Sequence, residues 1–176
     1  MIAFRHADPR YPFLWEEASQ PGARWHGPGE GPVQYLCDTP DGAWAEFLRH
    51  EEIRDPEELA TVRRALWAVE LGDEATYEPQ LPAEVLTGGP DTYAACREEA
   101  RRLRRLGATR VAAPSAALLR GAARGWRVDG GLQPAPDRDA KVLVLFGSRP
   151  DIVGWVAATE GRPGEELLPF VQHLSS

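Results

Sequence analysis

The chain has 176 residues, of which 43% are hydrophobic and 27% are charged, and its formal net charge at neutral pH is −7. This length and composition predict a globular domain with a sizeable core. The negative charge excludes a global basic field, so direct binding to nucleic acid is disfavoured.

The N-terminal residues and the hydropathy pattern favour a cytoplasmic location. The first residues, MIAFRHADPR, carry charges where a secretory signal peptide has an apolar stretch. No apolar run approaches the roughly 18 residues that a transmembrane helix needs. We therefore expect a cytoplasmic protein that makes no use of a membrane.

The first segment that suggests a function is the run GARWHGPGEGPVQYL, residues 22–36. Its glycines and prolines predict a tight bend between Arg24 and Tyr35. In one interpretation these two residues lie at the rim of an ordinary hairpin. In the other, the bend brings Arg24 and Tyr35 onto one surface, where they hold a flat, phosphorylated ligand.

A strand and a helix are predicted at and after the end of this bend. Residues 33–37 (VQYLC) form a short strand that is buried on at least one face. A helix over residues 40–50 is predicted from Thr39, a favourable N-cap, and from Pro40 at the first helical position. Glu46 then falls at the edge of the apolar stripe of this helix.

The rest of the chain mixes strands with one further helix. After a long connection over residues 72–91, Asp91 as N-cap and Gly107 as terminator predict a helix over residues 91–106. Strands are predicted at residues 65–71, 109–115, 141–147 and 151–158, and the last of these is expected to pair with the one before it. This mixed order predicts an α+β fold.

Several familiar catalytic and metal-binding patterns are missing from the sequence. There is no GxGxxG after a strand, no GxxxxGK[ST], no HExxH and no GxSxG. The two cysteines and four histidines do not have the spacing of metal ligands. We therefore expect no metal and no resident cofactor. Four tryptophans are interpreted as core or packing residues: Trp44, Trp67, Trp126 and Trp155.

Five short motifs, in order along residues 4–118, resemble those of the RES domain family. They are FRH, GARW, QYL, AWAEFLRH and VAAPSA. That family comprises the toxins of bacterial RES–Xre toxin–antitoxin pairs and is named for arginine, glutamate and serine residues. The resemblance implies a single RES-type domain over residues 1–176 with an ADP-ribosyltransferase-like fold, in which helices flank mixed β-sheets. It also implies NAD as the substrate, with phosphate as an optional co-substrate, and an Xre-type antitoxin as the partner protein.

Carried over residue by residue, the resemblance implies a catalytic or NAD-binding role for six side chains. These are Arg5, His6, Arg24, Tyr35, Glu46 and Ser115. The catalytic group consists of Glu46, Arg5 and Tyr35. The NAD-binding group consists of Arg24, Tyr35, Ser115 and His6, so Tyr35 belongs to both.

The residue types suit that chemistry independently of any family. Cleavage of the nicotinamide–ribose bond leaves an oxocarbenium-like sugar, whose positive charge a carboxylate such as Glu46 stabilises. The pyrophosphate needs forked cationic donors, which Arg5 and Arg24 supply better than lysines would. The ring of Tyr35 could stack on nicotinamide, and Ser115 could donate to a phosphate or a ribose.

Each residue alone also has a purely structural interpretation. Arg5 could be a salt-bridge partner, Arg24 a surface arginine, Tyr35 a core residue, Glu46 a solvated helix residue, and Ser115 a turn or cap residue. Three functions remain open: an NAD glycohydrolase or phosphorylase, an ADP-ribosyltransferase that modifies a protein, and a non-catalytic RES fold that binds a nucleotide or a partner. The sequence leaves the acceptor (water, phosphate or protein) undecided.

Overall fold

Seven strands form a central mixed sheet in the computed structural model, which describes residues 1–17 and 19–174. Their order across the sheet is β4-β5-β8-β2-β1-β3-β9, and all neighbours are antiparallel except β4 and β5, which are parallel. The strands are β1 (Ile2–Ala7), β2 (Val33–Cys37), β3 (Arg64–Glu70), β4 (Thr76–Tyr77), β5 (Arg110–Pro114), β8 (Lys141–Phe146) and β9 (Val153–Gly161). A separate hairpin pairs β6 (Ala123–Val128) with β7 (Leu132–Arg138).

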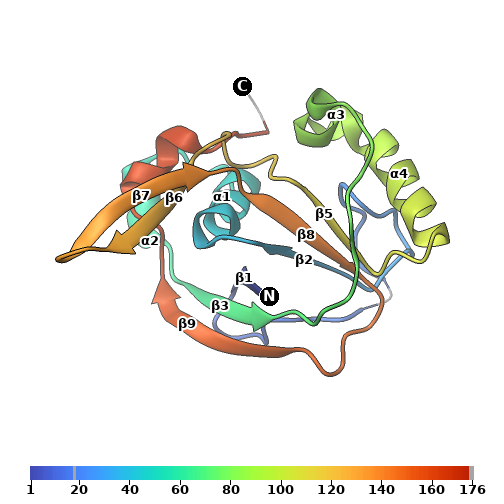
Figure 1. Ribbon diagram of the computed structural model, residues 1–176, viewed down its shortest axis with the longest axis horizontal. Helices are drawn as coiled ribbons and strands as arrows, with labels where there is room; N and C mark the ends of the chain where they lie inside the picture. Colours follow the sequence, from blue (N-terminus) through green and yellow to red (C-terminus); the bar gives the residue numbers. More distant parts are fainter. Residues whose placement is uncertain (18, 175–176) are drawn as a thin grey trace.

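Helices flank this sheet, which confirms the predicted α+β class (Figure 1). They are α1 (Pro40–His50), α2 (Pro56–Thr61), α3 (Ala83–Thr87) and α4 (Tyr93–Arg105), with 3₁₀ turns at η1 (Pro90–Thr92) and η2 (Glu165–Phe170). In the part of the chain that the structure describes, no helix is both long enough and apolar enough to cross a membrane.

The helix α1 begins and ends where the sequence predicts. The hydroxyl of Thr39 accepts a hydrogen bond from the backbone N–H of Gly42 at 3.0 Å, and Pro40 occupies the first turn. The helix packs against β1 and β2 on one side and against β6 and η2 on the other, so most of its side chains are buried. A Cβ atom on Gly42 would lie 3.0 Å from the Thr39 hydroxyl oxygen and 3.2 Å from the Cβ atoms of Cys37 and Ala140, so a larger residue here would force these neighbours to move.

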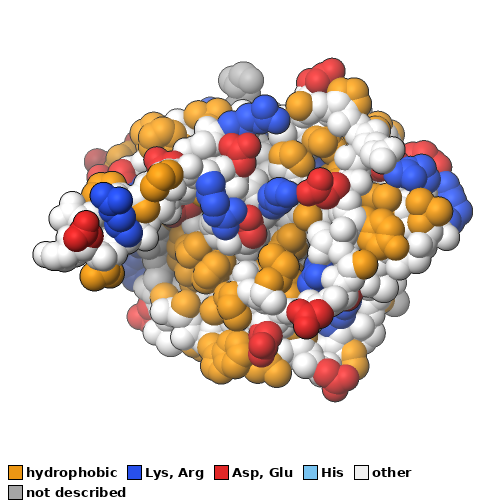
Figure 2. Space-filling view, viewed as in Figure 1, with side chains coloured by type: hydrophobic (Ala, Val, Ile, Leu, Met, Phe, Trp, Pro, Cys, Tyr) orange, Lys and Arg blue, Asp and Glu red, His pale blue; other side chains and the backbone are white. Residues whose placement is uncertain are grey.

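The sheet buries apolar side chains on both of its faces, as alternation along each strand requires. One face packs against α1 and includes Val33, Val111 and Val144. The other face carries a smaller cluster that includes Leu36 and Leu143. Figure 2 shows apolar side chains gathered in the middle of one side of the molecule, with charged side chains around them.

The strands β1 and β2 are paired at a single position and then diverge. The gap between the diverging strands, the seam, determines where the site lies. Their register consists of the pair Phe4 and Cys37. Beyond it, β1 pairs with β3 from Ile2 to Ala7, while β2 pairs with β8 along its whole length. The two strands therefore leave an opening between them at the residues that follow Phe4 and precede Cys37.

Two details of the sequence prediction are wrong in the middle and C-terminal parts. Strand β9 pairs with β3 rather than with β8, because β8 already lies between β5 and β2. Asp91 does not cap α4: it lies in η1, and the cap position is Thr92, which makes no side-chain cap hydrogen bond. The connection over residues 72–91 contains β4, α3 and η1.

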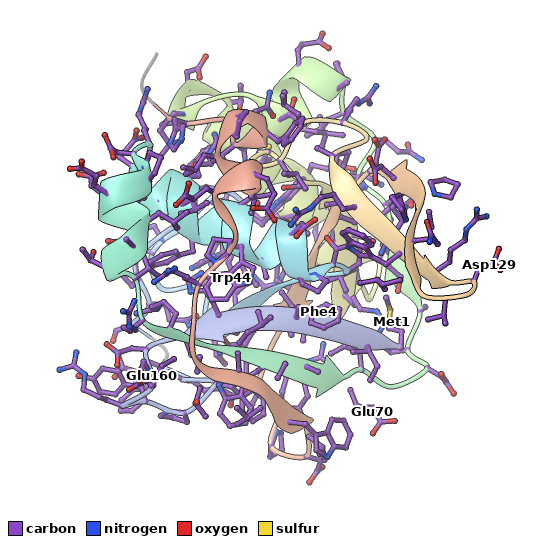
Figure 3. The ribbon with its side chains drawn as sticks, turned by 90° about the vertical axis from the view of Figure 1, so that its left-hand side faces the viewer. Met1, Phe4, Trp44, Glu70, Asp129 and Glu160 are labelled. Carbon is purple, nitrogen blue, oxygen red and sulfur yellow. The ribbon has the colours of Figure 1, made fainter. Side chains whose placement is uncertain are left out.

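The tryptophan prediction is correct for Trp44 and wrong for two others. Trp44 is 6% exposed on α1, whereas Trp126 on β6 is 57% exposed and Trp155 on β9 is 51% exposed. Figure 3 shows Trp44 of α1 near β1 and the hairpin end at Asp129 projecting from the body. A hairpin and an edge strand offer their outer side chains no partner layer, so hydrophobicity alone did not predict burial there.

Candidate functional site

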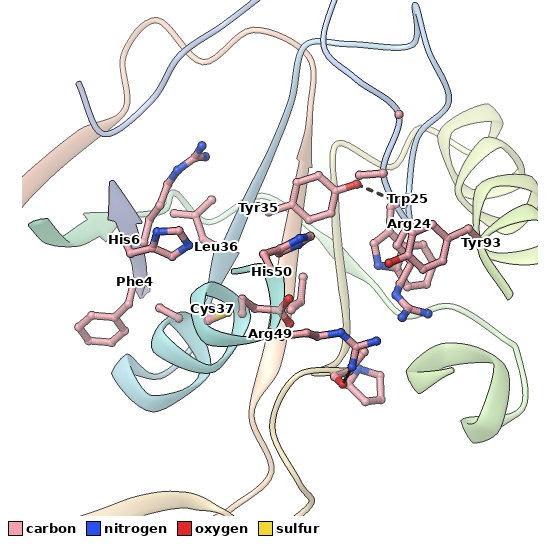
Figure 4. Close-up of a pocket in the computed structure, with 18 residues that line it drawn as sticks. Phe4, His6, Arg24, Trp25, Tyr35, Leu36, Cys37, Arg49, His50 and Tyr93 are labelled. Carbon is pink, nitrogen blue, oxygen red and sulfur yellow. Dashed lines mark hydrogen bonds between the residues drawn. The ribbon is translucent and has the colours of Figure 1, made fainter. Parts of the chain in front are cut away.

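A pocket of about 320 Å³ lies at the seam between β1 and β2. Its walls come from these two strands, from α1, from residues 22–25, from the first residue of α4 and from the turn that follows β5. Figure 4 shows Phe4 and His6 at one end of the pocket, Tyr35 and His50 in the middle, and Arg24 beside Tyr93 at the other end. Of the six side chains predicted for the site, all but Ser115 line this pocket.

Glu46 enters the pocket from α1 and is half-buried between the buried residues Ala45 and Phe47. Burial raises the pKa of the Glu46 carboxyl above its ordinary value. The nearby His50, Arg49 and Arg24, together with a hydrogen bond from Ser115, act in the opposite direction and favour the carboxylate. The helix edge predicted from the sequence is thus the edge that faces the pocket.

Ser115 stands outside the pocket wall but fixes the orientation of Glu46. Its hydroxyl accepts hydrogen bonds from the backbone N–H groups of Ala117 and Leu118, each at 3.2 Å. A hydroxyl has two acceptor lone pairs and one proton, so the proton remains for Oε1 of Glu46, at 3.2 Å. Ser115 therefore both caps its turn and orients Glu46, while its predicted donation to a phosphate or a ribose stays a prediction.

Tyr35 presents its ring to the pocket and anchors its hydroxyl in the bend. The backbone N–H of Trp25 donates to the Tyr35 hydroxyl at 3.1 Å, and Nδ1 of His26 lies 2.9 Å from the same oxygen. Burial raises the pKa of Tyr35, so the hydroxyl keeps its proton at neutral pH and can donate it to His26. These contacts hold Tyr35 against the segment that carries Arg24.

Arg24 lies at the far end of the pocket and holds the chain after α3. Its guanidinium donates to the carbonyl oxygen of Gly88 at 2.5 Å, to that of Val85 at 3.3 Å and to the Thr92 hydroxyl at 3.2 Å. It also stacks over the ring of Tyr93, with the carbon of the guanidinium 4.7 Å from the ring centroid. Much of its hydrogen-bonding capacity is therefore used within the protein, while its charge remains at the pocket wall.

Arg5 and His6 are adjacent on β1, and side-chain alternation directs them to opposite faces of the sheet. His6 lies on the α1 face, with its ring centroid 5.0 Å from that of Phe47. Arg5 donates to Oε1 of the buried Gln34 at 2.5 Å, on the other face. The open seam allows both residues to line the pocket, but Arg5 approaches it from the side opposite Glu46.

Burial changes the titration of both residues. It lowers the pKa of Arg5 to about 10, so this arginine stays charged at neutral pH. Burial, with help from the charge of Arg64, lowers the pKa of His6 to about 3, so this histidine is neutral.

Among the pocket residues that were not predicted from the sequence are Arg49, His50 and Tyr93. Arg49 and His50 follow Glu46 by three and four positions on α1, and this spacing was the available signal because such residues share a helix face. Tyr93, the first residue of α4, is half-buried at the pocket.

The fold and the pocket together define an α+β protein with a carboxylate, arginines and a tyrosine around a cavity between two diverging strands. A sequence profile described as the RES domain matches residues 2–162. The chain therefore belongs to the RES domain family, which confirms the family resemblance of its short motifs.

Known proteins that resemble the chain include a curated relative and a solved structure. Over 60 residues it is 47% identical to a Pseudomonas putida protein named Toxin Res. That match covers 34% of this chain and 39% of the relative, so it spans less than half the length of either protein. The fold is similar to a chain in the crystal structure of the M. tuberculosis MbcT–MbcA toxin–antitoxin complex, with a TM-score of 0.55 at 16% identity, covering 90% of this chain and 84% of that one.

Proposed function

We propose that this protein binds NAD in the pocket, cleaves the nicotinamide–ribose bond and acts as the toxin of a toxin–antitoxin pair. The observation that carries this proposal is the Glu46 carboxyl, which reaches a lined pocket from α1 and is oriented there by Ser115. No metal or resident cofactor is needed for this reaction, in which NAD is the substrate.

Glu46 stabilises the positive charge that develops on the ribose as nicotinamide leaves. The leaving nicotinamide takes the electron pair of the glycosidic bond and becomes neutral, while the sugar becomes oxocarbenium-like. A carboxylate in a half-buried site interacts more strongly with that charge than one in water, because the effective dielectric constant is lower. Water or phosphate then attacks the sugar carbon.

The arginines and the tyrosine bind and orient the substrate in this proposal. Arg5 stays charged despite its burial and can attract the pyrophosphate, and Arg24 adds positive charge at the other end of the pocket. The Tyr35 ring is fixed by its hydroxyl contacts, so it can stack on nicotinamide without losing further conformational freedom. Neutral His6 adds a polar ring beside Arg5 without a second charge.

The partner proposed for this protein is an Xre-type antitoxin. Support comes from the family, from the relative named Toxin Res and from the fold neighbour found in a toxin–antitoxin complex. Co-expression of the chain with a candidate antitoxin should restore growth that the chain alone inhibits.

The test of the enzymatic proposal is release of free nicotinamide from NAD by the purified protein, with and without phosphate. ADP-ribose as the second product indicates hydrolysis, and ADP-ribose 1″-phosphate indicates phosphorolysis. ADP-ribose attached to protein would indicate the alternative transferase activity. Binding of NAD without release of nicotinamide at high protein concentration would contradict the enzymatic proposal and leave a nucleotide-binding RES fold.

A further inference from the structure

Arg49 is a buried arginine, 5% exposed, one helical turn after Glu46 on α1. Its guanidinium donates to the carbonyl oxygens of Ala116 and Gln172, the latter at 2.8 Å, and approaches that of Gly88 at 3.4 Å. These three carbonyls come from the turn after β5, from the C-terminal segment and from the chain after α3. One side chain thus joins three segments that are far apart in the sequence.

The first of these contacts lies next to the residue that orients Glu46. Ala116 follows Ser115, and the backbone of the same turn is held by the Ser115 hydroxyl. The C-terminal segment supports this turn from outside, since the N–H of Gln172 donates to the carbonyl of Ala117 at 2.8 Å. Arg49 binds a carbonyl of this turn (Ala116) and a carbonyl of the C-terminal segment that packs on the turn (Gln172). It therefore controls where the Ser115 hydroxyl lies.

Arg49 also places a positive charge beside Glu46. Residues three apart on a helix are neighbours, and an opposite charge at that distance favours the ionised carboxylate. The groups that face Glu46 are Arg49 and His50 from α1, Arg24 from the segment before β2, Tyr35 and Cys37 from β2, and Ser115 after β5.

We infer that Arg49 is a positioning residue for Glu46, which it acts on in two ways: it holds the turn that carries Ser115, and it keeps a positive charge beside the carboxylate. It does so without being required to touch the substrate, because its Nη1 donates to two carbonyl oxygens of the protein and its Nη2 approaches a third. As far as catalysis is concerned, this inference rests on the proposed NAD cleavage by Glu46.

The experiment compares R49Q and R49K with R110Q as a matched control. Arg110 is also a buried arginine, 4% exposed, that holds the carbonyls of Gly72 and Glu74, but it lies outside the pocket wall. The pKa of the Glu46 carboxyl is measured by carbon NMR on glutamate-labelled protein, with E46Q to assign the signal. The rate of nicotinamide release is measured as a function of pH on the same proteins.

In R49Q, the Glu46 pKa should rise by about one unit, and the acidic limb of the rate–pH profile should move to higher pH by the same amount. R49K keeps the charge, so the Glu46 pKa and the acidic limb of the profile should stay close to their wild-type values. The maximal rate should fall, because a lysine cannot hold three carbonyls in the same geometry. R110Q should lose stability without moving the Glu46 pKa.

An unchanged Glu46 pKa in folded R49Q would overturn the inference, and so would a shift of the same size in R110Q. If R49Q does not fold, R49K decides alone: a Glu46 pKa raised by a full unit despite the retained charge overturns the electrostatic role. The NMR titration needs no activity. Failure of the wild-type protein to release nicotinamide would therefore contradict the proposed function and leave the effect of Arg49 on Glu46 measurable.

Discussion

The Ser115 hydroxyl donates a hydrogen bond to Oε1 of Glu46 at 3.2 Å, across 69 positions of the sequence. Both lone pairs of that hydroxyl accept hydrogen bonds from backbone N–H groups of its own turn, so its proton is directed at the Glu46 carboxylate. A residue type that ordinarily caps a turn here also fixes a carboxylate on a different element.

Replacing Glu46 by glutamine should lower NAD turnover by about 10²–10³-fold, because the amide has no charge to place beside the developing cation. The nearly isosteric change at a half-buried position should leave the melting temperature close to that of the wild type. The measurement is the rate of nicotinamide release. E98Q, on an exposed face of α4, is the matched control, and turnover in E46Q equal to that in E98Q would return Glu46 to a structural role.

Removing the Ser115 hydroxyl should raise the Glu46 pKa, since the hydrogen bond from Ser115 favours the ionised carboxylate. Activity that requires ionised Glu46 is lost as the pH falls through that pKa. In S115A, the acidic limb of the rate–pH profile should therefore move to higher pH by about 0.5–1 unit. S115T keeps the hydroxyl and should keep the wild-type profile. A profile unchanged in S115A would mean that the hydroxyl only caps its turn.

Local signals predicted the helix that carries Glu46 but not the partners of that residue. Thr39 and Pro40 mark the start of α1 by capping rules, and the apolar period places Glu46 at its edge. The contact with Ser115 depends on how β5 lies beside β8 and α1, and no local pattern encodes that arrangement. The family resemblance implied a role for Ser115, whereas it assigned none to Arg49, although Arg49 lies within the motif AWAEFLRH.

Strand pairing, like the contact between Glu46 and Ser115, is not encoded by a local sequence pattern. The apolar residues of the segment at β9 predict a strand, and the tendency of sequence neighbours to pair predicts the preceding strand as its partner. In the structure β9 lies at the edge beside β3, and the strands β2, β1 and β3 separate it from β8. Alternation along β1 predicts that Arg5 and His6 point to opposite faces, but only the divergence of β1 from β2 explains how both reach one pocket.

His6 should make the protein less stable in acid. Its folded-state pKa of about 3 lies below its ordinary value of 6.5, so between these values the unfolded chain binds a proton that the folded protein does not. The free energy of unfolding should therefore fall as the pH falls below 6.5, by up to about 1.4 kcal/mol per pH unit from this group. The stability is fully present above pH 6.5.

The measurement is urea unfolding of the wild type and H6Q at pH 7 and pH 5. The wild type should lose more stability than H6Q over this range, and the difference between the two proteins removes the opposing contribution of Glu46, whose pKa is raised. Proton NMR of the His6 ring checks the cause. Titration of that ring near pH 6.5 in the folded protein would contradict the prediction.

Two variants of Tyr35 should separate the contribution of its hydroxyl to stability from the contribution of its ring to ligand binding. Y35F removes the acceptor of the Trp25 N–H and the partner of His26, both of which are buried. Leaving buried polar groups without partners should cost about 1–3 kcal/mol in the free energy of unfolding, while the ring still lines the pocket. The control is Y77F, which should cost less because the Tyr77 hydroxyl that it removes donates a long bond, at 3.4 Å, to the carbonyl oxygen of Leu106.

Y35A removes the ring as well, and it should weaken NAD binding more than ADP-ribose binding, because only NAD carries the nicotinamide on which the ring can stack. Titration calorimetry of both ligands against wild type, Y35F and Y35A measures this difference. Y35F should keep the wild-type ratio of the two affinities, since its aromatic face is unchanged. Equal weakening of NAD and ADP-ribose in Y35A would show that the ring serves the fold or another part of the nucleotide, and the nicotinamide would then have to be placed against a different wall of the pocket.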